Sequence, residues 1–156
     1  MRELVFALEF RGSAGPVPGV DGRRRARTSA TSQVLRTLLR AGDVQATVEP
    51  TGEGVAILES EVLSTGEGTF VESGTISYGD AGRVAFRTVG QGVTGASAIE
   101  GLRHGAVIWE VMRGEGRLAG AQGLITSNFT VGRDGQVTDN HFVRLFLPAY
   151  LGGGPP

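Results

Sequence analysis

Cysteine is absent from the sequence and aromatic residues are scarce. The chain has 156 residues with no Cys, two His, and only 6% of Phe, Trp and Tyr together. Without thiols it forms no disulfide and has no thiolate nucleophile. The His residues show no His-x-His or His-x-x-x-His spacing, so we expect no metal site. So few aromatic rings also argue against a stacking platform for single-stranded nucleic acid.

An excess of charge of either sign is lacking. The formal net charge is −1 and charged residues make up 20% of the chain, so no strong field attracts nucleic acid or an anionic membrane. The one basic run, GRRRAR at 22–27, is interpreted as a solvated loop or strand start in preference to a nucleic-acid patch.

Long hydrophobic runs are missing as well. No apolar stretch approaches the roughly 20 residues that a membrane span needs. The first segment, MRELVFALEF, carries charges within its apolar run and has no small-residue cleavage site, which is not typical of a signal peptide. We therefore expect a cytoplasmic protein with no membrane partner.

Glycine is present in excess, at 26 of 156 residues, against an average of about 7%. The glycines recur between β-branched stretches, as many short turns require. The length is typical of one domain, which we place at residues 1–150, with the Gly/Pro-rich segment LGGGPP at 151–156 as a flexible tail.

Most of the chain is predicted to form β-strands separated by short turns. Strand-like segments rich in Val, Ile, Thr and Phe lie at 3–10, 44–49, 54–64, 68–79, 83–92, 105–112, 119–131 and 136–148. Because the links between them are short, the strands should pair as antiparallel neighbours. A single-domain meander of this kind tends to close, so we expect an all-β fold with one antiparallel eight-stranded β-barrel.

Residues 28–42 are ambiguous between helix and strand. Val34, Leu35, Leu38 and Leu39 suit one helical face, and Ser32 is a suitable N-cap for a short N-terminal helix. The Thr, Ser and Val content of the same segment equally suits a strand.

The stretch GEGRLAGAQG, at 114–123, contains the G-x-G-x-x-A pattern of a dinucleotide-binding turn. That motif needs a helix directly after the glycines, because the helix N-terminus binds the pyrophosphate. The sequence that follows, GLITSNFTV, predicts a strand instead. We therefore interpret Gly114 and Gly116 as turn residues with positive φ, and Gly120 and Gly123 as the sites of a bulge or coiled strand.

This hairpin resembles the glycine hairpin of the allene oxide cyclase and dirigent-protein superfamily. The matching residues are Gly114, Gly116, Gly120, Ala121 and Gly123, with Leu118 at the aromatic position. The resemblance implies an eight-stranded barrel with an apolar cavity, often assembled as a homo-oligomer such as a dimer or trimer. Members of the superfamily include cofactor-free cyclases and proteins that steer a reactive intermediate made by a separate oxidase. No further family motif matches, so no catalytic residues are carried over.

Glu110 is the first candidate catalytic residue. It shares a strand face with Ile108 and Met112, opposite Val107 and Trp109, so both faces of this strand are largely apolar. If both are covered, desolvation would raise the pKa of Glu110 into the range of a general acid or base. The alternative is a carboxylate at a strand end paired with an arginine.

Other charged side chains offer further candidates. Glu59 and Glu61 share a face and form either a proton-shuttling pair or part of a solvated outer face. Arg87 could neutralise one of these carboxylates or hold an anionic group of the substrate.

Polar residues near the strand ends complete the catalytic set. His141 shares a face with leucines and is either a core residue or a catalyst. Asn128 lies across the GRDG turn from it, where its amide could donate to a developing enolate oxygen or bond to a backbone edge. Tyr78 is a candidate proton donor or a residue of the barrel rim.

The function expected from these features is that of a cofactor-independent cyclase or isomerase in natural product biosynthesis. Its substrate would be a hydrophobic small molecule folded into a reactive conformation by the cavity. Contacts to that molecule are assigned to Glu59, Glu61, Phe86, Trp109, Ile108, Met112 and Phe129. The alternative is a non-catalytic protein that binds a hydrophobic ligand or acts in a dirigent-like way.

Overall fold

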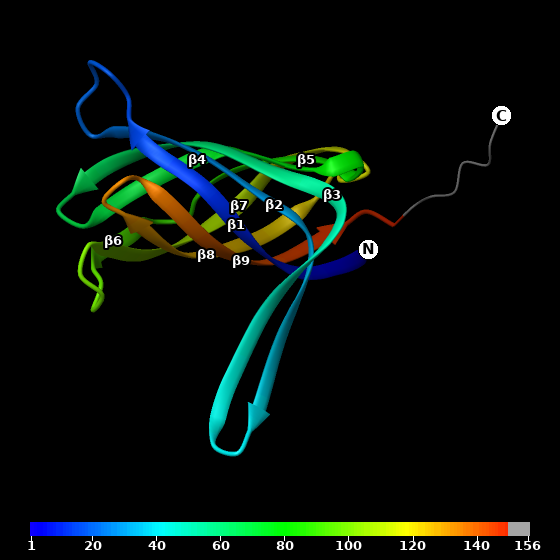
Figure 1. The fold of residues 1–156 in the computed structure, drawn as a ribbon. Helices are drawn as coiled ribbons and strands as arrows, with labels where there is room; N and C mark the ends of the chain where they lie inside the picture. The colour runs from blue at the N-terminus through cyan, green and yellow to red at the C-terminus, as the bar shows by residue number, and fades with distance from the viewer. Residues whose placement is uncertain (150–156) are drawn as a thin grey trace.

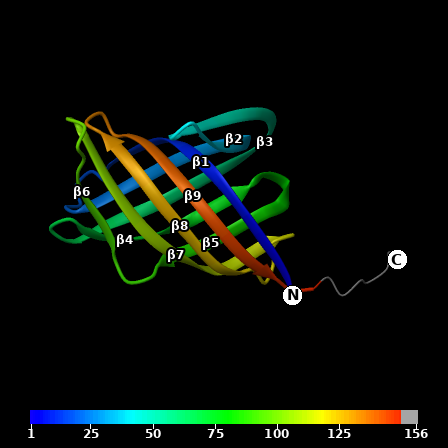
Figure 2. The ribbon, with the colours of Figure 1, turned by 90° about the horizontal axis from the view of Figure 1, so that it is seen from below.

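The computed structural model describes residues 1–149, which form one antiparallel β-sheet that closes on itself in a ring (Figures 1 and 2). The flexible tail predicted at 151–156 lies outside the described residues. The strands are β1 (Arg2–Pro16), β2 (Arg23–Arg40), β3 (Asp43–Gly66), β4 (Thr69–Tyr78), β5 (Gly82–Thr88), β6 (Gly92–Ala96), β7 (Leu102–Gly116), β8 (Gln122–Gly132) and β9 (Gln136–Leu147).

The order of the strands around the ring follows the chain, as a meander should. β1 pairs with both β2 and β9, and the pairing of β3 with β4 closes the circuit. β5 and β6 both lie between β4 and β7, because each of them pairs with both of those strands. The expected all-β antiparallel architecture is confirmed, with nine strands instead of eight. β2 and β6 are additional to the expected strands, while the expected strands at 44–49 and 54–64 are both part of β3.

The segment that was ambiguous between helix and strand is a strand, so the predicted short N-terminal helix is wrong. Arg23–Thr31 pairs with β3 inside the ring, and Gln33–Arg40 pairs with Asp43–Pro50 in a hairpin. The backbone N–H and C=O groups of this segment thus bond to β3, whereas in a helix they would bond to one another. Within residues 1–149 the one helical element is η1 (Gly79–Ala81), and no helix there is long and apolar enough to span a membrane.

This hairpin, residues 33–50, is called the arm below. It extends away from the ring as a two-stranded ribbon (Figure 1). It joins the ring at a register break. Thr31 pairs with Val55 and Gln33 pairs with Pro50, so two steps along β2 correspond to five along β3. The expected strands at 44–49 and 54–64 are therefore one strand that runs from the arm into the ring.

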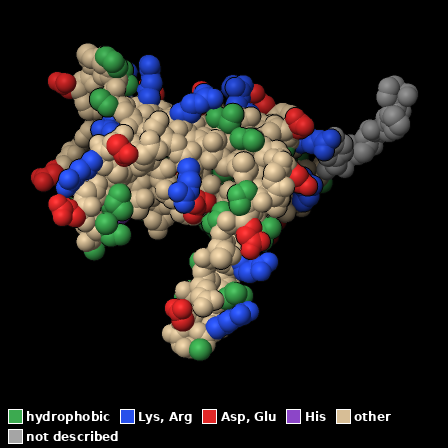
Figure 3. Space-filling model, in the orientation of Figure 1, with side chains coloured by type: hydrophobic (Ala, Val, Ile, Leu, Met, Phe, Trp, Pro, Cys, Tyr) green, Lys and Arg blue, Asp and Glu red, His purple; other side chains and the backbone are tan. Residues whose placement is uncertain are grey.

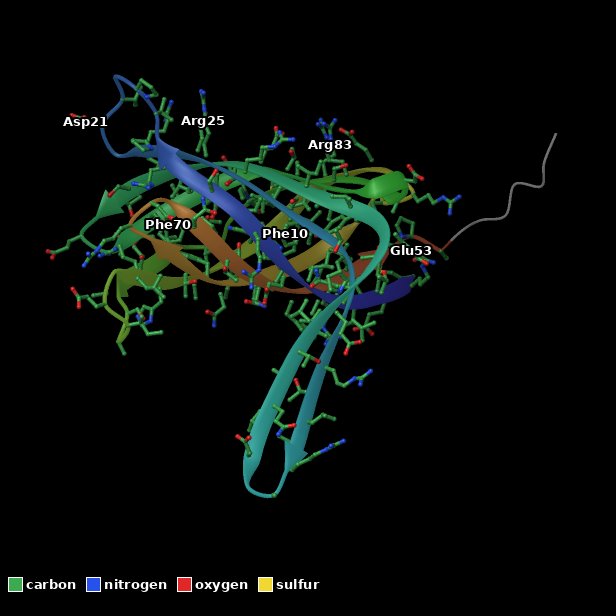
Figure 4. All side chains as sticks on the ribbon, viewed as in Figure 1. Phe10, Asp21, Arg25, Glu53, Phe70 and Arg83 are labelled. Carbon is green, nitrogen blue, oxygen red and sulfur yellow. The ribbon has the colours of Figure 1, made fainter. Side chains whose placement is uncertain are left out.

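The core fills the inside of the ring, and alternation along the strand is most regular in β9. In β9 the inward residues Val137, Asp139, His141, Val143, Leu145 and Leu147 are all buried. Phe10 and Phe70 also point inward, whereas Arg25 and Arg83 point away from the ring (Figure 4). The two faces of each strand therefore have separate roles, which decides where a ligand can be held.

The glycine hairpin contains no helix, so the dinucleotide-binding interpretation is excluded. β7 ends at Gly116 and β8 begins at Gln122. Gly116 has the expected positive φ, at 66°. Gly114 does not, and it is needed for close approach instead: a Cβ atom there would lie 1.9 Å from the carbonyl oxygen of Leu118.

Candidate functional site

One end of the ring opens into a cavity of about 860 Å³. This volume is in the range of pockets that hold small organic molecules. Its walls come from the inner faces of strands on all sides of the ring. The apolar lining includes Leu58, Val62, Phe70, Phe129 and Val137, and the polar lining includes Thr28, Glu72 and Asp139.

Glu72 is a carboxyl group buried against this cavity. The alternation of β4 places it on the inner face with Phe70 and Ile76. Its Oε1 atom accepts a hydrogen bond of 2.6 Å from the Ser60 hydroxyl. Burial raises its pKa from 4.5 to about 7, because desolvation disfavours the carboxylate.

Neighbouring groups adjust that pKa in both directions. The hydrogen bond from Ser60 lowers it, and the negative charge of Asp139 raises it. The indole N–H of Trp109 also lowers it by proximity, although it does not reach full hydrogen-bond geometry. At neutral pH Glu72 therefore exists in both protonation states, as a general acid or base requires.

Asp139 is the second buried carboxyl group, and it joins Ser127 to His141. Its Oδ1 accepts a bond of 2.6 Å from the Ser127 hydroxyl, and its Oδ2 lies 2.9 Å from Nε2 of His141. Because the carboxylate stands between the hydroxyl and the imidazole, His141 does not act as a base toward Ser127. The arrangement therefore differs from a nucleophilic serine triad.

Aromatic rings connect the two carboxyl groups. His141 stacks on Phe10 with ring centres 4.4 Å apart, and it meets Trp109 edge-on at 5.1 Å. Trp109 in turn stacks on Phe86 at 4.2 Å. The Nδ1 atom of His141 is buried without a hydrogen-bond partner among the described residues.

The structure corrects the expected surroundings of Glu110, which lies on the outer face of β7. Its Oε1 accepts a hydrogen bond of 2.7 Å from Nε of Arg87, and the side chains are 39% and 61% exposed. Ile108 and Met112 are exposed on the same outer face, because Trp109 takes the inner one. The alternative of a carboxylate paired with an arginine is the one that the structure adopts.

Glu59 and Glu61 also lie on the outer face, as the solvated alternative predicted. Glu59 pairs with Arg27, and Glu61 lies 3.5 Å from Arg25. The basic run at 22–27 forms the start of β2, and its residues Arg23, Arg25 and Arg27 meet these carboxylates across the β2–β3 ladder.

The remaining candidates are divided between the two faces. Asn128 is exposed on the outer face of β8, opposite Asn140, so it does not approach the buried ring of His141. Tyr78 is partly buried and lies outside the cavity lining, with its ring 5.3 Å from that of Phe6. Its hydroxyl has no hydrogen-bond partner in the described part of the chain, and burial raises its pKa.

The expected contact residues divide in the same way. Phe129 lines the cavity, while Phe86 and Trp109 point inward beneath it. Sequence reasoning missed Glu72 as the acidic residue of the site. The signal was present, because Glu72 shares its strand face with Phe70 and Ile76, whereas the other face of β4 carries Ser and Thr residues besides Val71.

The mouth of the cavity is rich in arginine. Arg23, Arg24, Arg103 and Arg133 contribute to its lining there, together with Asp21. Arg23 and Arg133 have carboxylate neighbours at 3.9 Å and 3.3 Å. Arg24 and Arg103 form no ion pair within residues 1–149, so their charge is available at the entrance.

Comparison with known proteins gives no match. No family model, no curated protein and no solved structure matches this chain. The fold and site define a closed antiparallel sheet with a ligand-sized internal cavity, and the resemblance of the glycine hairpin to the allene oxide cyclase and dirigent superfamily stays a prediction.

Proposed function

We propose that the protein is a cofactor-independent isomerase or cyclase that binds an apolar small molecule inside the ring. One observation carries this proposal: Glu72, a buried carboxyl group with a pKa of about 7, faces a cavity large enough for such a molecule. A carboxyl group with that pKa both donates and accepts a proton readily at neutral pH.

The cavity would contribute through orientation and Glu72 through proton transfer. Apolar walls of Leu58, Phe70 and Phe129 would hold the substrate in a folded conformation. The carboxylate form of Glu72 would take a proton from a carbon acid, and its protonated form would return a proton to another position. Ser60, which donates to Oε1, would orient the carboxyl group during both steps.

The architecture of the ring supports the same class. Counting β5 and β6 as one position between β4 and β7 leaves eight positions around the ring. We therefore propose a barrel of the allene oxide cyclase type, as the glycine hairpin suggests.

The alternative is a non-catalytic protein that holds a hydrophobic ligand. The polar groups beneath the cavity favour this alternative, since Ser60 bonds to Glu72 and Ser127 bonds to Asp139. Groups that satisfy one another stabilise a polar network without any reacting ligand.

The test separates binding from proton transfer. A panel of apolar ketones and polyenes is screened by the fluorescence of Trp109, the single tryptophan of the chain. Compounds that bind are incubated with protein in D₂O, and deuterium incorporation and rearrangement are followed by NMR. Glu72→Gln should lower the rate about 100-fold or more while leaving the dissociation constant within a few fold.

Glu110→Gln is the matched control, because it makes the same change on the outer face. It should leave the rate unchanged. If bound compounds undergo neither exchange nor rearrangement, the protein is a carrier. A loss of rate in Glu110→Gln but not in Glu72→Gln would contradict the assignment of the proton to Glu72.

A further inference from the structure

The arm is amphipathic, with its charges confined to one face. Directly paired residues in an antiparallel ladder lie on the same face. One face carries the pairs Arg36–Thr47 and Arg40–Asp43, together with Glu49, which pairs with Arg36 at 4.0 Å. All charged side chains of residues 33–50 are on this face, which will be called the charged face.

The opposite face of the arm carries no charge and is exposed. Its cross-strand pairs are Gln33–Pro50, Leu35–Val48, Thr37–Ala46 and Leu39–Val44. Leu39 is 78% exposed and Val44 66% exposed. Figure 3 shows hydrophobic side chains at the surface of the arm, away from the body of the molecule. This surface will be called the uncharged face.

An isolated two-stranded ribbon is marginally stable in water, so an exposed apolar face of this kind indicates a partner surface. Val34 and Leu38 lie on the charged face, paired with Glu49 and Gln45, but no charge lies on the uncharged face. A ribbon that served only as a solvated loop would need no such exclusion of charge from one face. The arm has no other element of the described chain packed on its uncharged face, since residues 41–50 are all exposed.

A second unpartnered surface lies on β1, where the arm leaves the ring. β1 pairs with β2 only from Arg11 to Pro16. Among the described residues, Arg2–Leu8 pairs only with β9, so one edge of this stretch is open. Gln33 marks the boundary, because its side-chain amide bonds to both the N–H and the carbonyl of Glu9 and so replaces the ladder there.

The open edge exposes part of the core. Leu4, Phe6 and Leu8 point into the ring, yet they are only partly buried because no strand covers the seam beside them. These side chains, like the uncharged face, bear no charge. The two surfaces also match in length: eight residue pairs of the arm span about 27 Å and the seven residues Arg2–Leu8 about 24 Å, at ~3.4 Å per residue.

We propose that the arm of one copy of this chain packs its uncharged face on the open β1 edge of a second copy, and that the second arm does the same in return. The occupant is a second copy because both unpartnered surfaces belong to one chain and have the same length and chemistry. A single contact of one ribbon face is small beside the ~800 Å² per partner of a stable interface. A twofold arrangement makes the contact twice, which enlarges the interface.

A pair of threonines on opposite faces of the arm gives the test. Thr37 lies on the uncharged face and Thr47 on the charged face, and both are exposed in the single chain. The variants Thr37→Glu and Thr47→Glu therefore make the same chemical change on opposite faces. Sedimentation velocity over a range of concentrations measures the dissociation constant, and the emission of Trp109 confirms that the ring of each variant is folded.

The wild-type chain should sediment as a dimer, with twice the mass of the 16.3 kDa chain. Thr37→Glu should raise the dissociation constant about tenfold or more, because it buries a charge in the interface. Thr47→Glu should leave it within about threefold, since a glutamate there faces solvent and Arg36. Hydrogen exchange should show the amides of Arg2–Leu8 better protected in the wild type than in Thr37→Glu.

Three outcomes would overturn the proposal. The first is a wild-type chain that stays monomeric at every concentration, which would leave the uncharged face free for a different protein. The second is an equal effect of the Thr37 and Thr47 variants. The third is a dimer that Thr37→Glu dissociates without any change in exchange at Arg2–Leu8, which would place the arm on another surface of the second copy.

Discussion

Glu72 should make the stability of the protein depend on pH in an unusual direction. Its pKa in the folded chain is about 7, above the 4.5 of the unfolded chain. Folding therefore favours the protonated form, so the stabilisation is complete below pH 4.5 and is lost as the pH rises toward 7. A rise of this size corresponds to a loss of about 3 kcal/mol over that interval.

Glu72→Gln removes this dependence, because the amide keeps the shape of the protonated carboxyl group without ionising. The free energy of unfolding is measured by urea denaturation at pH 4 and at pH 8. The difference between the variant and the wild type should shift by about 3 kcal/mol in favour of the variant over this interval. Glu110→Gln, on the outer face, should lose as much unfolding free energy between pH 4 and pH 8 as the wild type does. A variant Glu72→Gln that loses stability with pH as the wild type does would contradict the assignment.

The residues of the site could be predicted from the sequence only in part. Period-two alternation correctly grouped His141 with the apolar residues of β9, and the structure places that group inside the ring. The same alternation grouped Glu110 with Ile108, but the opposite face, with Val107 and Trp109, is equally apolar. Alternation shows which residues share a face, and only the closure of the ring decides which face is the inner one.

At the scale of the element, the strands were predictable where turn residues separate them. The segment 28–42 was not, because the spacing of Leu35, Leu38 and Leu39 satisfies both a helical and an extended pattern. Its partner, β3, decides the outcome through pairing that no local pattern contains. The link between the expected strands at 44–49 and 54–64 suggested a turn, whereas the residues there continue β3 across the register break between arm and ring.

The start of β8 depends on a glycine that passes very close to β9. At Gly123 the φ angle is +143°, and a Cβ atom would lie 2.1 Å from the carbonyl oxygen of Arg144. Gly123→Ala should therefore destabilise the fold by about 2 kcal/mol or more, through both the backbone conformation and the clash.

Gly15→Ala in β1 is the matched control, because nothing lies within 4 Å of a Cβ atom built there. Thermal and urea denaturation of the two variants should differ clearly, with Gly15→Ala within about 0.5 kcal/mol of the wild type. Equal stabilities would show that β8 shifts away from β9 at no cost, and that the close approach is not required.

At the scale of the whole molecule, the distribution of charge is more informative than its sum. The net charge of −1 hides a concentration of arginine at the mouth of the cavity. Because the inner walls are largely apolar, a ligand that suits both regions has an apolar body and an anionic end. Arg24 and Arg103, which form no ion pair in the described chain, are the residues best placed to meet that end.

Two arginines on β7 allow this preference to be tested. Arg103 lines the cavity mouth, whereas Arg113, near the other end of the strand, lies 3.2 Å from Glu115 on the outer surface. Binding of anilinonaphthalene sulfonate, an apolar anion, is compared with binding of neutral Nile red, each followed by quenching of Trp109.

Arg103→Ser should weaken binding of the sulfonate about threefold to tenfold, because one charge-assisted contact at a solvated mouth contributes about 1 kcal/mol. It should leave binding of Nile red unchanged, and Arg113→Ser should affect neither probe. Added salt should weaken binding of the sulfonate and leave binding of Nile red unchanged, since salt screens only the interaction with the charged probe. If both arginine variants weaken the sulfonate equally, the attraction comes from the charge of the whole molecule and the mouth does not select an anionic group.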